Sequence, residues 1–167
     1  VVTRIIGVAK DITDQIEASE SLRDSEQRYR MLAESISDVI CSTDSQLALN
    51  YISPSVNTVL GYDVDWVFKN GWQSIVANPQ QLTGIYSLME QVSRALGNPD
   101  ALNTLRDEVQ TQLFLFDCLR ADGRKVPIEL RLVLVWDEHG AFEGILGVGR
   151  DISQQRRAEK DLRMAAT

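Results

Sequence analysis

Apolar and polar residues alternate along the last third of the chain in a way that predicts three successive β-strands. Val126, Ile128 and Leu130 begin an alternation that runs to Trp136, so one face of this strand is apolar. Gly-containing turns, Ala121-Asp122-Gly123 and Glu138-His139-Gly140, separate this strand from its neighbours. We therefore expect antiparallel strands over residues 109–119, 126–136 and 142–152.

Two shorter strands and several helices are predicted before these three. Strands are expected over residues 38–44 and 47–53, and a short helix that begins at Ser53-Pro54-Ser55 is expected to end near Gly61. Further short helices are expected over residues 63–68 and 100–108. A longer helix is predicted by apolar residues at helical spacing, namely Leu82, Ile85, Leu88, Met89, Val92 and Leu96.

This order of elements predicts an α+β fold. We expect a five-stranded antiparallel sheet with short helices on one face and a flanking helix at each end. On the other face of the sheet, Glu129 and Arg131 indicate solvent, whereas Val133 and Val135 are apolar. This apolar part of the outer face needs a cover, either a flanking helix or a partner chain.

Residues 14–37 contain no Gly or Pro and predict a helix with apolar residues seven positions apart. One interpretation is an amphipathic helix that lies on its own domain, and the other is a parallel coiled coil with a second copy. Both interpretations stay open, and both make this segment a connector. Its dimerisation or signalling residues would be Leu22, Tyr29, Leu32 and Ile36.

The two ends of the chain repeat each other. Residues 5–23 and 145–163 are identical at nine of 19 aligned positions, without a gap. In each copy a strand reaches Asp-Ile-Thr or Asp-Ile-Ser and passes into a helix, and these side chains are good helix caps. The repeat predicts four parts: the last strand of a preceding, truncated domain (1–13), a helical connector (14–37), an intact domain (38–153) and the start of the next connector (154–167).

Composition excludes several classes of function. The net charge of −7 argues against nucleic-acid binding, and no apolar run is long enough to span a membrane. A single histidine, His139, and two distant cysteines, Cys41 and Cys118, give no metal or redox motif. A disulfide between the cysteines stays open, although buried free thiols are favoured. We expect no catalytic residues, no metal site, no membrane contact by this segment and a cytoplasmic location, with anchoring of the parent protein to the inner membrane left open.

Three segments resemble a PAS domain with its C-terminal PAC strands. They are DVICSTDSQLALNYISPSVNTVLGY at 38–62, FDCLRADGRKVPIEL at 116–130 and DEHGAFEGILGVGRDISQQRRAEKDLR at 137–163. The strongest signature is Gly-Val-Gly-Arg-Asp-Ile-Ser at 147–153, followed by a charged helix. The resemblance covers about residues 24–153 and implies a PAS/PAC sensory-box module of a multidomain bacterial-type signalling protein.

The resemblance also implies a function without catalysis. A pocket would perceive a small ligand or partner, and the flanking helices would pass the signal to a histidine kinase or a diguanylate cyclase/phosphodiesterase. Asp151, Ile152 and Ser153 would form the signal-exit motif. The implied partners are a second copy, an unidentified small ligand, and adjacent PAS and output domains. The alternatives are a ligand-free dimerisation or spacer domain and a non-covalent flavin redox sensor.

The cofactor stays unknown, but two are disfavoured. Trp72 occupies the position of the cysteine that forms a covalent flavin adduct in this family, and Val76 replaces the glutamine that contacts the flavin. His-ligated haem is disfavoured because residues 82–108 contain no histidine. Residues 81–108 are longer than usual for the family, as a lid or, as we favour, a surface insertion. The expected pocket residues are Val39, Cys41, Thr43, Tyr51, Trp72, Ile75, Leu132 and Trp136.

Overall fold

The computed structural model describes residues 14–23 and 37–166. The chain divides into two compact units, residues 1–36 and 37–167. In the first unit, residues 14–23 form a helix, and the predicted last strand over residues 1–13 lies outside the described residues. None of the described helices is long and apolar enough to cross a membrane.

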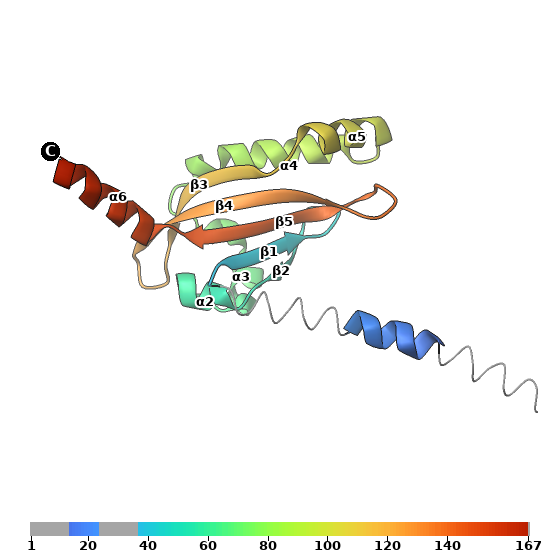
Figure 1. Cartoon of the computed structure of the whole chain (residues 1–167), viewed down its shortest axis with the longest axis horizontal. Helices are drawn as coiled ribbons and strands as arrows, with labels where there is room; N and C mark the ends of the chain where they lie inside the picture. The colour runs from blue at the N-terminus through green and yellow to red at the C-terminus, as the bar shows by residue number, and fades with distance from the viewer. Residues whose placement is uncertain (1–13, 24–36, 167) are drawn as a thin grey trace, which may run out of the picture. The chain divides into compact units, whose positions relative to one another are not determined.

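The second unit is built on a five-stranded antiparallel sheet, which confirms the predicted α+β fold. Its strand order is β2-β1-β5-β4-β3, so the last strand of the chain lies at the centre (Figure 1). The three pairings of consecutive strands and the long-range pairing of β1 with β5 are all antiparallel. The strands are β1 (Val39–Thr43), β2 (Leu49–Ile52), β3 (Gln112–Leu119), β4 (Lys125–Trp136) and β5 (Phe142–Asp151).

Helices fill the connection between β2 and β3, and local sequence signals explain where they begin and end. Gly61 ends the first helix in the left-handed conformation that glycine adopts without a Cβ penalty. Asn78 and Asn98 each precede a proline and accept a hydrogen bond from a backbone N–H in the first turn. The helices are α2 (Ser55–Leu60), α3 (Val64–Asn70), α4 (Thr83–Ala95), α5 (Pro99–Glu108) and, after the sheet, α6 (Ser153–Ala166), with 3₁₀ helices η1 (Trp72–Ile75) and η2 (Pro79–Leu82).

The core lies between the helices and one face of the sheet. Val56 of α2, Val67 of α3 and Val92 of α4 have no exposed surface. The alternation predicted for β4 is confirmed, since its inner residues are buried while Val133 on the outer face is 41% exposed. The inner face therefore positions any internal site.

The central strand β5 approaches β1 too closely for a side chain at one position. A Cβ built on Gly144 would lie 2.1 Å from the carbonyl oxygen of Thr43, and the φ angle of Gly144 is +151°. A backbone carbonyl cannot move away as the end of a flexible side chain can. Glycine is therefore required here for β1 and β5 to pair.

We predict that Gly144→Ala lowers the free energy of unfolding by about 3 kcal/mol or more, because the new methyl group forces β1 and β5 apart. The matched control is Gly97→Ala. Gly97 also has a positive φ, but a methyl group added there would have nothing within 4 Å, so this change should cost only about 1–2 kcal/mol. Urea unfolding followed by circular dichroism measures both. Equal losses in the two variants would contradict the proposed steric requirement.

Candidate functional site

An apolar cavity of about 150 Å³ lies between the inner face of the sheet and the helices. Strand β1 supplies Val39, Cys41 and Thr43 because alternate residues of a strand share a face. The 3₁₀ helix η1 supplies Trp72 and Ile75. These five and Leu132 of β4 are the sequence-predicted pocket residues that line the cavity.

Tyr51 does not line the cavity, which corrects its prediction. The pairing of β1 with β2 is irregular, since Ser42 faces Tyr51 but Thr43 faces Leu49, so that Asn50 is skipped. This bulge reverses the alternation along β2. Leu49 therefore joins the cavity wall, whereas Tyr51, the cross-strand partner of Ser42, lies on the opposite face.

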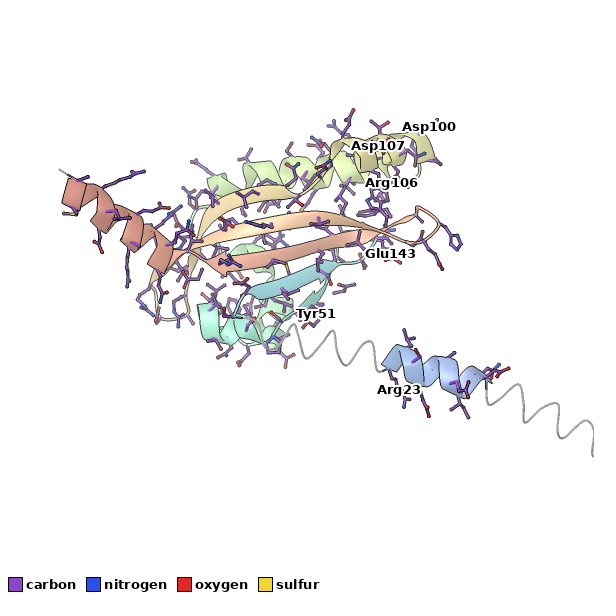
Figure 2. The ribbon with its side chains drawn as sticks, in the orientation of Figure 1. Arg23, Tyr51, Asp100, Arg106, Asp107 and Glu143 are labelled. Carbon is purple, nitrogen blue, oxygen red and sulfur yellow. The ribbon has the colours of Figure 1, made fainter. Side chains whose placement is uncertain are left out.

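Trp136 is the second correction, because it lies beyond the cavity at the end of β4. Its ring packs edge-on against Phe142, with 5.5 Å between ring centroids. The guanidinium of Arg106 lies 5.2 Å from the Trp136 ring centroid, which makes a cation–π contact between α5 and the sheet. Figure 2 shows Arg106 on α5, above the β4–β5 hairpin. Trp136 thus anchors α5 and does not reach a ligand.

Several wall residues were missed by the sequence analysis. Ile85 and Met89 show that α4 builds the cavity wall, so the first half of the long segment is not a surface insertion, whereas α5 buries no residue completely. The apolar spacing of α4 and β4 was the available signal. The missed residues are Leu47, Leu49, Ile52, Leu60, Val76, Ile85, Met89, Phe116, Cys118, Ile128, Leu130, Ile145 and Gly149.

Both cysteines line this cavity as free thiols. Burial raises the pKa of Cys41 from its ordinary value of 9.0 to about 11, although a hydrogen bond from the Gly147 backbone opposes the shift. Burial, reinforced by the charge of Asp117, raises the pKa of Cys118 to about 12. Two strands separate β1 from β3, so the two thiols lie at least about 14 Å apart across the sheet, well beyond the reach of a disulfide.

The wall offers almost nothing to a polar cofactor. It carries no Asp, Glu, Lys, Arg or His among the described residues. The Thr43 hydroxyl already donates to the Asp44 carbonyl and accepts from the Ile145 N–H, at 3.0 Å each. This wall offers no cation to pair with the phosphate of a flavin nucleotide.

Haem and metal ions also lack partners here. His139 lies in the β4–β5 turn with its side chain 84% exposed, away from the cavity wall. No group of three or more His, Cys, Asp or Glu residues gathers within the described part of the chain. The arrangement thus favours binding of a small molecule over chemistry on one.

The Asp-Ile-Ser segment joins the cavity wall to helix α6. Asp151 is the cross-strand partner of Ile128, which lines the cavity. The Asp151 carboxylate accepts hydrogen bonds from the backbone N–H and the hydroxyl of Ser153, at 2.8 and 2.5 Å. Ile152 is buried, and its N–H donates to the Pro127 carbonyl at 3.0 Å. The Ile152 N–H therefore ties the junction to β4, and the Asp151 carboxylate holds the first turn of α6.

The predicted dimerisation residues are only partly described. Leu22 lies on the helix over residues 14–23 and is 62% exposed. Tyr29, Leu32 and Ile36 lie outside the described residues.

Comparison with known proteins finds a curated relative and several structures with this fold. The two-component sensor PprA of Pseudomonas aeruginosa is 27% identical over 175 residues, which cover 96% of this chain and 16% of the relative. The chain therefore spans about a sixth of that protein. Two solved structures share the fold: the PAS domain of a protein from Colwellia psychrerythraea, with 22% identity, a TM-score of 0.55 and coverage of 77% of this chain and 97% of the other, and the N-terminal domain of a diguanylate cyclase with PAS/PAC sensor from Marinobacter aquaeolei, with 20% identity, a TM-score of 0.52 and coverage of 71% and 98%.

The family model described as a PAS domain matches residues 37–154. This range contains the whole sheet, the cavity and the start of α6. The match covers well over half of the chain, and the fold agrees with it. The chain therefore belongs to the PAS domain family.

Proposed function

We propose that this PAS domain is a ligand sensor that passes a conformational change from its cavity to helix α6. The carrying observation is the pairing of Ile128, on the cavity wall, with Asp151, which holds the first turn of α6. A ligand that contacts Ile128 differently in two arrangements of this junction shifts the population between them. Transmission then needs no catalytic group.

The output of the parent protein is part of the same proposal. The Pseudomonas relative is a two-component sensor, and the Marinobacter structure comes from a diguanylate cyclase. We propose that α6 leads towards an output domain of one of these two kinds, a histidine kinase or a cyclic-di-GMP enzyme. The cytoplasmic location of this domain and the neighbouring PAS domain remain parts of the proposal.

We also propose a homodimer. Leu22 is exposed on its helix, and the outer sheet face exposes Leu113 by 53% and Leu115 by 50%. Apolar side chains of this size are unfavourable in water, at about 25 cal/mol per Å² of apolar surface. A second copy that covers such side chains would remove this apolar surface from water.

Loss of the Asp151 carboxylate should uncouple α6 from the cavity. We expect a compound that raises the melting temperature in a metabolite screen to change amide hydrogen exchange in residues 153–158 of the parent chain. In Asp151→Ala this response should be lost, because the cap is worth about 1 kcal/mol and the first turn frays without it. Hydrogen–deuterium exchange with mass spectrometry measures the effect.

The matched control is Asp151→Asn, whose amide oxygen still accepts from Ser153 and which should keep the response. A ligand that binds the parent chain and leaves exchange in α6 unchanged would contradict the sensory proposal. A screen without any stabilising compound would favour the ligand-free spacer.

Negative charges at the predicted dimerisation residues of the connector helix should separate the two copies. Leu22→Asp combined with Leu32→Asp places a carboxylate at two predicted contact positions, where burial of an unpaired charge is costly. We expect the variant to elute as a monomer in light scattering at concentrations where the parent is dimeric. Glu20→Asp, a charge-conserving change on an exposed position, is the control. A variant as dimeric as its parent would refute dimerisation through Leu22 and Leu32.

The cavity thiols should act as apolar wall groups and not as redox groups. Their folded pKa values of about 11 and 12 exceed the ordinary 9.0, so folding favours the protonated form. The stability this gives is complete below pH 9 and is lost as the pH rises through about 11 to 12. By pH 10 we expect a loss of about 1 kcal/mol per thiol relative to a Cys41→Ala, Cys118→Ala control.

Urea unfolding at pH 8 and pH 10 measures this difference. Alkylation by iodoacetamide at pH 8 should also be at least about tenfold slower in the folded than in the unfolded chain. Rapid alkylation of the folded chain would show an accessible thiolate and reopen a redox role.

A further inference from the structure

We propose that the ligand of the cavity is an electrically neutral, apolar molecule about the size of a single aromatic ring. This inference rests on the proposed sensory function and narrows it to a chemical class. It follows from the charge of the wall, from the state of its polar groups and from its volume.

The first step is the absence of a counter-ion. No residue of the described cavity wall carries a formal charge at neutral pH, and its two thiols stay protonated. Two carboxylates that alternate with wall residues along their strands are occupied elsewhere: Asp117 accepts from the Gln81 side-chain amide at 3.4 Å, and Glu129 pairs with Arg131 at 3.4 Å. A carboxylate, phosphate or ammonium ligand would lose its hydration here without gaining an ion pair, which is strongly unfavourable.

The second step is the shortage of hydrogen-bond partners. The Thr43 hydroxyl uses its proton on the Asp44 carbonyl and one lone pair on the Ile145 N–H. The thiols of Cys41 and Cys118 are weak donors. Trp72 brings the remaining side-chain donor, a single indole N–H. A ligand with several polar groups would therefore leave most of them unsatisfied, at a cost for each.

The third step is size. Engineered cavities of about 150 Å³ with apolar walls stay dry and bind benzene, and this cavity has that volume and that chemistry. Gly149 of β5 lines the cavity, and a Cβ added there would have no heavy atom closer than 3.6 Å. A methyl group added at Gly149 would therefore fit without a clash, in ordinary van der Waals contact with Ile128, Val39 and Leu130.

Charge-matched probes test the proposal on the full chain. Benzene and toluene are compared with benzoate and benzylamine, which keep the ring and add one charge. We expect benzene and toluene to shift the amide resonance of Gly149 in ¹H–¹⁵N NMR titrations, and the two ions to leave it in place at the same concentrations. Gly149→Ala should weaken toluene binding about tenfold, because the methyl group occupies ligand space.

Glu143→Ala, at an exposed position of β5 outside the cavity wall, is the matched control and should bind toluene like the parent chain. Binding of benzoate as tight as that of toluene would overturn the proposed ligand class, and so would an unchanged affinity in a folded Gly149→Ala. The resonances of α6 separate the two proposals. If a charged ligand binds and shifts Ser153, the ligand class is wrong while sensing stands; if toluene binds without shifting Ser153, the ligand class stands while sensing is wrong.

Discussion

Close approach of β5 to its two neighbours is the constraint on which the cavity depends. The central strand has β1 on one side and β4 on the other, and its inner face carries glycine where these strands' side chains meet. A Cβ on Gly147 would lie 2.8 Å from the Cys41 sulfur and 3.0 Å from Leu132. A larger residue at Gly147 would push both neighbours outward, whereas a Cβ at Gly149 would have no heavy atom closer than 3.6 Å. The same strand thus joins the two halves of the sheet and, through its glycines, leaves room for the cavity on the inner face.

This constraint also places the exit from the domain. Because β5 is central, its last residue, Asp151, pairs with Ile128 inside the sheet and not at a free edge. The chain then turns into α6 within two residues, with the buried Ile152 as its anchor. A change in the spacing of β4 and β5 can reach the helix directly, because only Ile152 separates β5 from α6. The Gly-Val-Gly-Arg-Asp-Ile-Ser signature therefore has three structural roles. Gly149 lines the cavity, Ile152 anchors the connection to α6, and Asp151 caps the first turn of α6.

Sequence reasoning reached the fold because the alternation in β4 and the turn signals around it are local. It reached the cavity residues of β1 for the same reason, since Val39, Cys41 and Thr43 follow a period of two. Tyr51 was misplaced because a bulge reverses this period, and nothing in the residues of β2 announces a bulge. Trp136 lies on the inner face of β4, as predicted, but beyond the end of the cavity. Where the cavity ends along β4 depends on which helices pack over the strand, and the strand's own sequence does not show this. The roles of Met89 and Gly149 in the cavity wall could not be predicted, because they depend on how α4 packs against the sheet.

The volume of the cavity sets an energy scale for signalling. In proteins with engineered cavities, empty volume costs about 24 cal/mol per Å³, which for about 150 Å³ amounts to about 4 kcal/mol. A neutral ligand that fills the space recovers part of this cost without an ion pair or a new hydrogen bond. If half of it favoured one arrangement of the β4–β5–α6 junction, the population ratio would change about thirtyfold. An uncharged apolar wall is then sufficient for switching, because the stabilisation comes from van der Waals contacts between the ligand and the wall.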